Sequence, residues 1–457
     1  PVAPTVAEAL KDFKPRQTTS TAEAFDPSQA NIDKRSKRSD IGDVKVVLLT
    51  KKNRGETVNF SMRFHTGDEK SLFGQQVNAS FAAQMLMRGT TKFSRAQLKD
   101  EFDKLKITGN VSGLGGSFQT TRQNVGAAIR LIVHTMREPS FPEAEFEQLK
   151  SQSLASLDLQ RSDPNAVANL AVGRHFNVYP KGDYRYVATL EESIENVKAA
   201  TLADVKRFHQ TFYGGNRGEI ALVGDFDEAE VTKVIAESLA GWKTDAPYSR
   251  LINKFTDIAP VTRAIETPDK ENAVFRARIN VEMNLDDPDF PALYLADYIL
   301  GGGAGFDSRL MARIRVKDGL SYGVGSGLNA GSIDRAGSWN AQAIAAPQNI
   351  EKVEIAFKEE LARAIKDGFT PAELAAAKSG TMQQRLQTRA QDSSLARAWE
   401  SNLYLGKTFV WSKQFEEKLL ALKADEVQAA LKKHIDPAKI TIVKAGDFSK
   451  VQKATTK

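Results

Sequence analysis

The chain has 457 residues, of which 41% are hydrophobic and 26% charged, with a net charge of +6 and a pI near 9.1. This composition is ordinary for a globular protein, and the length predicts two or more domains. The absence of cysteine excludes disulfides, thiolate zinc sites and a cysteine nucleophile. No apolar run approaches the roughly 20 residues that a membrane span requires. The basic pI is the only feature that favours nucleic-acid binding, and the sequence contains no nucleic-acid-binding motif, so we expect no nucleic-acid partner.

The first 40 residues are polar and predict an extended N-terminal arm, with ordered structure from about Val44. The chain starts Pro-Val-Ala-Pro, which is typical of a processed N-terminus. Removal of a signal peptide would explain such a start and favours a periplasmic location, and a trimmed expression product would explain it equally well.

Residues 44–49 predict a strand, and alternating apolar residues over 58–64 predict a second, half-buried strand. Helical patterns follow at 74–88, 94–105 and 122–137, with a long helix after Pro142. Ser94 with Gln97 forms a capping box, and Thr201 with Asp204 caps a later helix. A strand at 218–223 ends at Gly-Asp-Phe. This mixture of hairpin strands and packed helices predicts an α+β fold.

The second half repeats this order of elements. Residues 275–283 predict a strand, 288–300 a helix, 350–361 an amphipathic helix and 369–374 the start of a long helix. Lys378 follows Lys150 by 228 residues, Gly446 follows Gly224 by 222, and Phe275 follows Phe60 by 215. Such a near-constant offset predicts two homologous domains of about 220 residues. We place them at 41–245 and 266–450, joined by a linker at 246–265.

Residues 80–84 read Ser-Phe-Ala-Ala-Gln, on the first predicted helix of the first domain. An inverted zinc motif, H-x-x-E-H, would place two imidazoles and a carboxylate on such a helix. Serine, alanine and glutamine provide neither metal ligands nor a base. The five histidines, at 65, 134, 175, 209 and 434, are too far apart to form the motif elsewhere.

The Met-Leu-Met-Arg-Gly-Thr segment at 85–90, the Asp163-Pro164 junction and residues 310–324 resemble the pitrilysin/insulinase family of zinc metallopeptidases. This family includes mitochondrial processing peptidase and two-chain bacterial relatives. The resemblance covers about residues 40–450 and implies two α+β domains arranged as a clamshell. Aligned on Gly89-Thr90, the family's two zinc-binding histidines fall on Ser80 and Gln84, and its glutamate falls on Ala83.

The family's third zinc ligand is a glutamate about 75 residues later. The matching stretch, residues 152–160, has no glutamate, and its only acid, Asp158, is expected to face solvent on a helix. All the catalytic positions are therefore vacated together. The resemblance implies that this chain binds no zinc and has no catalytic residue, and that a partner chain holds the metal.

Arg315 and Tyr322 match the family's R-x6-Y pattern within Gly319-Leu320-Ser321-Tyr322. In the family this pair donates hydrogen bonds to the substrate main chain and to the developing oxyanion. Arginine stays charged at any physiological pH, and a tyrosine hydroxyl can donate a hydrogen bond, so both residue types suit stabilisation of an oxyanion. Seen without this context, a surface arginine beside a packed tyrosine would be the simpler interpretation. Gly301–Gly305 follows a helix and lacks a phosphate-loop ending, so we interpret it as a connection that could also handle substrate.

These features predict the non-catalytic subunit of a heterodimeric zinc metallopeptidase. A homologous partner with an intact H-x-x-E-H would carry the zinc. This chain would contribute Arg315 and Tyr322, and the substrate would be an unfolded peptide that adds as a strand to a sheet edge. The alternative is a structural core subunit of a larger complex without a peptidase role. The retained Arg315 and Tyr322 argue against that alternative, because a scaffold needs no oxyanion donors.

Overall fold

The computed structural model describes residues 22–303 and 308–449. The first half contains α2 (Gln29–Arg35), β1 (Lys37–Ile41), β2 (Val44–Thr50), β3 (Thr57–Phe64), α3 (Gln76–Met85), the 3-10 turn η1 (Leu86–Arg88), α4 (Arg95–Lys104), β4 (Thr108–Gly109), β5 (Gly115–Thr121), α5 (Val125–Arg137), α6 (Glu143–Gln160), α7 (Pro164–His175), α8 (Leu190–Ala199), α9 (Leu202–Phe212), β6 (Gly218–Gly224) and α10 (Glu228–Leu239).

The second half contains β7 (Thr262–Glu266), β8 (Ala273–Val281), α11 (Phe290–Asp297), the π-helices η2 (Tyr298–Gly302) and η3 (Met311–Lys317), β9 (Ser321–Asn329), β10 (Gly337–Ala345), the 3-10 turn η4 (Pro347–Asn349), α12 (Ile350–Asp367), α13 (Pro371–Ala390), α14 (Asp392–Leu405), α15 (Phe409–Ala421), α16 (Ala424–His434), the 3-10 turn η5 (Pro437–Lys439) and β11 (Thr441–Gly446).

Each half builds one mixed sheet, and the two sheets share a topology. The strand orders are β1-β2-β6-β3-β5-β4 and β7-β11-β8-β10-β9. Among the described strands, β2 pairs in parallel with β6 in the first sheet and β7 with β11 in the second, and the other pairings are antiparallel. The predicted α+β duplication is therefore confirmed, and β1 is an extra edge strand of the first sheet.

The landmarks that predicted the repeat occupy equivalent places. Phe60 lies in β3 and Phe275 in β8, and both side chains are fully buried. In α6, Lys150 donates to the carbonyl of Ala200 (2.8 Å) at the end of α8. In α13, Lys378 donates to the carbonyl of Leu422 (2.6 Å) at the end of α15. Each lysine thus ties a long helix to the carbonyl end of the helix beside it.

Two predicted boundaries were wrong. Ordered structure does not begin at Val44, because α2 and β1 precede it. Ser28 caps α2 through Asn31, and β1 pairs with β2 from Lys37 to Ile41. The rest of the predicted arm, residues 1–21, lies outside the described residues. The linker also ends earlier than predicted, because residues 262–266 form β7.

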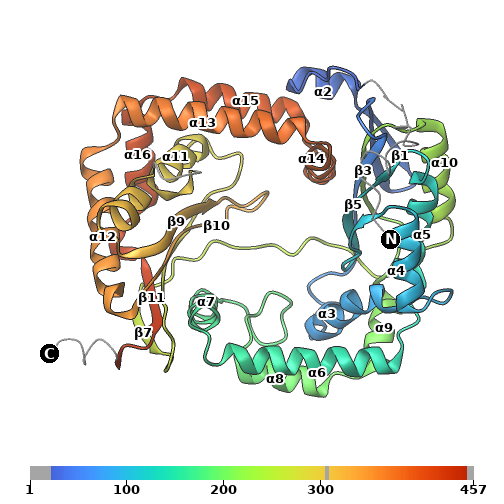
Figure 1. Ribbon diagram of the computed structural model, residues 1–457, viewed down its shortest axis with the longest axis horizontal. Helices are drawn as coiled ribbons and strands as arrows, with labels where there is room; N and C mark the ends of the chain where they lie inside the picture. Colours follow the sequence, from blue (N-terminus) through green and yellow to red (C-terminus); the bar gives the residue numbers. More distant parts are fainter. Residues whose placement is uncertain (1–21, 304–307, 450–457) are drawn as a thin grey trace, which may run out of the picture.

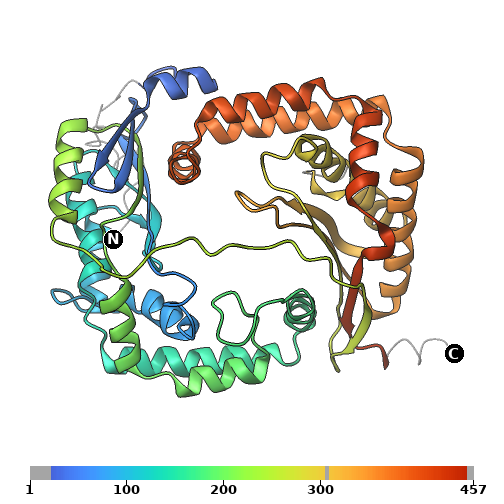
Figure 2. The same ribbon diagram turned by 180° about the vertical axis from the view of Figure 1, so that it is seen from behind.

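The two sheets stand at opposite sides of the molecule (Figure 1), with α13 and α15 across one end and α6 and α8 across the other. Seen from behind, residues 247–261 run as an irregular segment from the first half to the second (Figure 2). Each half has its own large apolar core between its sheet and its helices. No helix in the described ranges is long and apolar enough to cross a membrane.

Each half also lends one helix to the other half's sheet. The second-half helix α14 packs on β6 and β3 of the first sheet (Figure 1). There the fully buried Trp399 meets Val47, Leu49, Ala221 and Val223. In return, the first-half helix α7 packs on β8 and β11, through Ala168 and Val172 against Val274, Val443 and Ala445. These two contacts hold the halves together independently of the linker.

Trp399→Ala tests the larger of the two exchanged contacts. Removing a fully buried indole should lower the free energy of unfolding by about 3–5 kcal/mol, measured by chemical denaturation. The control is Leu159→Ala, at a side chain that is 75% exposed, which should change stability by less than about 0.5 kcal/mol. Equal effects of the two substitutions would contradict the assigned role of α14.

Candidate functional site

Helix α3 carries the three predicted positions of the absent zinc motif. Its buried face consists of Ala79, Phe81, Ala82 and Met85. Ser80 and Gln84 are exposed on the opposite side, one helical turn apart, and Ala83 is half-buried between them. The Gln84 amide donates to the Ser80 hydroxyl (3.1 Å). The two positions are therefore side by side, as two metal ligands would be, and are joined by a neutral hydrogen bond.

A pocket of about 660 Å³ opens beside this pair, between α3, α6 and α8. We name it the α3 pocket. Its polar lining is nearly all amide and hydroxyl, and its one charged side chain, Arg88, pairs with Glu145 (2.8 Å). No histidine, aspartate or glutamate lines it. In a chain without cysteine, zinc sites are built from such donors, so the α3 pocket offers neutral hydrogen-bonding groups and none of the usual zinc ligands. Its lining comprises Gln76, Val77, Ser80, Phe81, Gln84, Arg88, Leu149, Gln152, Ser153, Ser156, Leu157, Gln160, Ala188, Ser193, Asn196 and Val197.

Asp158, the only acid of the stretch where the third ligand was expected, faces solvent as predicted. Its side chain is 77% exposed and accepts a hydrogen bond from Arg161 (3.1 Å). It does not line the α3 pocket.

Tyr322 stands at an irregularity of the second sheet's edge. The β9–β10 register pairs Gly323 with Ile344 and then Ser321 with Ala345, so Tyr322 is the extra residue of a β-bulge. Bulges redirect side chains at sheet edges. The Ser321 hydroxyl bonds to the carbonyl of Ile344 (2.7 Å) and accepts from the Gly323 amide (3.1 Å). The tyrosine ring is 68% exposed, and its hydroxyl makes no hydrogen bond to another described residue.

Arg315 lies on the π-helix η3, which ends four residues before β9 begins. Its side chain is exposed, as are its neighbours Val316 and Lys317. π-Helical turns are rare and occur disproportionately at functional sites. Arg315 and Tyr322 therefore lie on adjoining elements, a π-helix and a strand that contains a bulge, and both side chains are exposed.

Buried Asp297 fixes the strand that carries Tyr322. Its carboxylate accepts hydrogen bonds from the Ser326 hydroxyl (2.6 Å), the Trp339 indole (2.8 Å) and the Leu328 amide (3.2 Å). Burial raises the pKa of Asp297, and these three donors oppose that rise. One side chain thus joins α11 to β9 and β10. Sequence reasoning missed this residue, because nothing in the chain around it marks an aspartate as buried.

The α3 pocket and the Arg315/Tyr322 pair belong to different halves. First-half residues alone line the pocket, while η3 and β9 lie at the edge of the second sheet. The described contacts do not join them into one site.

Two residues of the Gly301–Gly305 connection lie outside the described residues. Gly301 and Gly302 end η2, and a side chain at Gly302 would collide with Asp297.

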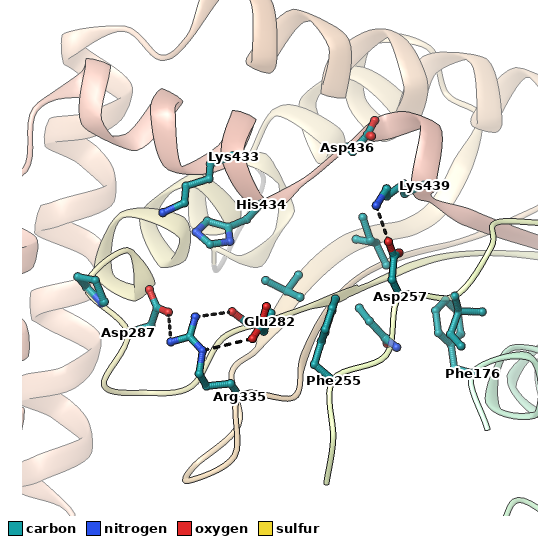
Figure 3. A pocket seen from close by; sticks show the side chains of 15 residues that line it. Phe176, Phe255, Asp257, Glu282, Asp287, Arg335, Lys433, His434, Asp436 and Lys439 are labelled. Carbon is teal, nitrogen blue, oxygen red and sulfur yellow. Dashed lines mark hydrogen bonds and ion pairs between the residues drawn. The ribbon is translucent and has the colours of Figure 1, made fainter. Parts of the chain in front are cut away.

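A second pocket, of about 570 Å³, lies where the linker crosses the second half (Figure 3). Its charges are largely paired within it: Arg335 with Asp287 (2.7 Å) and Lys439 with Asp257 (2.6 Å). Asp287, Asp289 and His434 place donor atoms within 4.8 Å of one another. Sequence reasoning missed this group, because His434 is far along the chain from both aspartates.

Comparisons with known proteins show what the sequence and the fold are similar to. The model of the peptidase M16 inactive domain matches residues 199–381. This part of the chain is therefore similar to a peptidase M16 inactive domain, and the chain also resembles proteins named as zinc proteases. This confirms the resemblance drawn from residues 85–90, 163–164 and 310–324.

Among the relatives is the "non-peptidase homolog YmxG" of Helicobacter pylori, which is 23% identical over 406 residues, covering 87% of this chain and 91% of that protein. The "zinc protease PqqE" of the same organism is 24% identical over 197 residues, covering 41% of this chain and 43% of that protein.

Solved structures share the fold. A peptidase M16 inactive domain from Pseudomonas fluorescens aligns with a TM-score of 0.78 at 22% identity, over 90% of this chain and 98% of its own. The periplasmic protease PqqL from Escherichia coli aligns with a TM-score of 0.69 at 15% identity, over 97% of this chain and 50% of its own.

We expect the purified chain to hold no zinc at the α3 pocket. Neutral amides and hydroxyls bind zinc too weakly to retain it. The zinc content per chain would be measured by elemental analysis after dialysis against equimolar zinc. Stoichiometric zinc that Gln84→Ala removes would contradict the vacated-site interpretation. The matched control is His434→Ala, which would remove any zinc held by the second-half aspartates.

Asp297→Ala should be strongly destabilising. It leaves the Trp339 indole, the Leu328 amide and the Ser326 hydroxyl without their acceptor, at about 1–3 kcal/mol for each buried unsatisfied donor. We expect thermal unfolding at a clearly lower temperature than for Asp257→Ala, which breaks an exposed ion pair. A loss no larger than that of the control would show that Asp297 does not anchor β9.

Proposed function

We propose that this chain is the non-catalytic subunit of a heterodimeric zinc metallopeptidase. Its partner would be a homologous chain with an intact H-x-x-E-H motif, which holds the zinc and performs hydrolysis. The observation that carries the proposal is the contrast between the two halves. The α3 pocket has no metal ligand, while the second half presents Tyr322 from a bulge braced by Ser321 and Asp297.

The chemistry assigned to Arg315 and Tyr322 is stabilisation of negative charge. When zinc-activated water attacks a peptide carbonyl, the carbonyl oxygen becomes an oxyanion. A tyrosine hydroxyl donates one hydrogen bond to such an oxygen, and a guanidinium donates several while remaining charged. A hydroxyl held in advance costs no reorganisation during the reaction. The bulge and the outward direction of Tyr322 suit donation to a group outside this chain.

The proposed substrate is an unfolded peptide that adds as a strand to a sheet edge. Among the described strands, β9 pairs only with β10, so an added strand would form its main-chain hydrogen bonds at the other edge of β9. We place this subunit in a bacterial periplasm. That location is supported by the likeness to a fold whose solved examples include a periplasmic protease.

Tyr322→Phe tests the proposed donor. Mixed with its catalytic partner, the variant should reduce kcat by about 10²–10³, the cost of losing one oxyanion donor, while gel filtration shows an unchanged heterodimer. The control, Tyr179→Phe, removes a hydroxyl that bonds to Asn253 in the linker and should leave kcat unchanged.

Unchanged turnover in the Tyr322→Phe heterodimer would refute the donor role. Full activity of the partner without this chain would instead favour the structural scaffold.

A further inference from the structure

Two arginines stand side by side in a pocket of the second half. Arg276 and Arg278 alternate along β8 and therefore point to the same face of the sheet. The pocket encloses about 400 Å³ between α7 and strands β8, β10 and β9. We name it the arginine pocket. Its other polar side chains are amides and one hydroxyl: Asn169, Ser326, Asn329, Asn340 and Gln342.

Across the described ranges, no carboxylate lies within ion-pair distance of the guanidinium group of Arg276 or of Arg278. Arg276 donates to the side-chain oxygens of Asn169 (2.9 Å) and Asn165, and Arg278 donates to that of Asn280 (3.2 Å). Several other half-buried arginines do contact a carboxylate, among them Arg88, Arg185, Arg309 and Arg389, whereas Arg217 donates to the carbonyl of Ala246.

This arrangement is energetically unfavourable in the chain alone. Both side chains are only partly exposed, and desolvation lowers the pKa of both guanidinium groups. Burying a cation without a counter-charge is costly, and two like charges on neighbouring positions add repulsion. The Phe176 ring lies 4.5 Å from the Arg278 guanidinium at the end of α7, where the helix dipole is negative. Those contacts offset part of the cost, yet the buried Nε of Arg278 has no acceptor in the described structure.

The pocket reaches the open edge of the sheet. In one row of cross-strand neighbours, Gln342 of β10 lies between Gly325 of β9 and Arg276 of β8. In the next row, Asn340 lies between Gly327 and Arg278. Two rows therefore run across the sheet, each from a glycine on the edge strand to an arginine. The glycines carry no side chain above the sheet, so a chain lying along β9 could extend a side chain over them toward the guanidinium groups.

We propose that the arginine pocket binds a carboxylate of the peptide that lies along β9, so that the protein prefers substrates with an acidic residue. This proposal rests on the proposed peptide-binding function and adds a substrate class to it. A carboxylate would supply the missing counter-charge and accept from both arginines, and the amides around it would bind the main chain. A bidentate arginine–carboxylate contact is among the stronger charge-assisted hydrogen bonds.

The test is calorimetric titration of this chain, without its partner, with three short unstructured peptides. The first has one internal glutamate and blocked ends, the second replaces that glutamate with glutamine, and the third is the second with a free C-terminal carboxylate. We expect the first peptide to bind at least about tenfold more tightly than the second. Preference for the third would assign the pocket to a C-terminal carboxylate. Equal binding of all three would overturn the proposal, as would binding of inorganic phosphate as tightly as the acidic peptide.

Variants connect that preference to the pocket. Arg276→Gln and Arg278→Gln should remove the difference between the first two peptides and leave binding of the glutamine peptide unchanged. The matched control for net charge is Arg130→Gln, at an exposed arginine paired with Glu237 on the first half, which should keep the preference. Loss of the preference in the control would show a general charge effect and overturn the assignment.

Thermal unfolding separates a binding role from a structural one. Because Arg278 lacks a counter-charge, Arg278→Gln should leave the unfolding temperature unchanged or raise it. Arg309→Gln should lower it, because Arg309 pairs with Glu373 (2.6 Å) and lowers the pKa of that carboxyl to about 2. A large loss of stability in Arg278→Gln would overturn the proposal.

The two proposals can fail separately. If Tyr322 governs turnover but the peptides bind alike, only the acidic preference is wrong. If acidic peptides bind but no zinc-bearing partner gains activity from this chain, the subunit role is wrong.

Discussion

The exchange of helices between the halves is the constraint on which the rest of the structure depends. Each sheet has one face covered by its own helices and the other face partly covered by a helix from the opposite half. Without α14, the side chains of Val47, Leu49, Ala221 and Val223 would face water. Burial of apolar surface therefore stabilises one relative placement of the halves. The arginine pocket exists only because α7 lies on the second sheet.

The second half shows how a sheet edge can be made rigid enough to present a side chain. An edge strand lacks hydrogen bonds on one side, so its position must be fixed from within the sheet or from below. Asp297 does this from α11, through Ser326, Leu328 and Trp339. Ser321 then fixes the bulge itself. The cost is a buried carboxylate, and three donors directed at it offset that cost.

The two halves have equivalent folds and differ in their polar groups. Beside α3, the pocket is lined mainly by uncharged amides and hydroxyls, and its one charged side chain, Arg88, is paired with Glu145. On β8, two guanidinium groups have no carboxylate partner among the described residues, unlike several other half-buried arginines of the chain. The two halves can share a fold and still differ in the chemistry of their pockets, because the side chains that build the cores are separate from those that face the pockets.

Local sequence patterns were sufficient to predict the duplicated α+β fold, the main strands and the caps at Ser94 and Thr201, because periodicity and capping depend on neighbours in the chain. The resemblance to the pitrilysin/insulinase family singled out Ser80, Ala83 and Gln84, through alignment on Gly89-Thr90, and Arg315 and Tyr322, through the family's R-x6-Y pattern. The bulge at Tyr322, the anchoring by Asp297, the exchange of α7 and α14 and the pairing state of Arg276 and Arg278 could not be predicted. Each depends on which residues far apart in sequence become neighbours, and a single sequence without that geometry does not say whether a charge is buried or what stands opposite it.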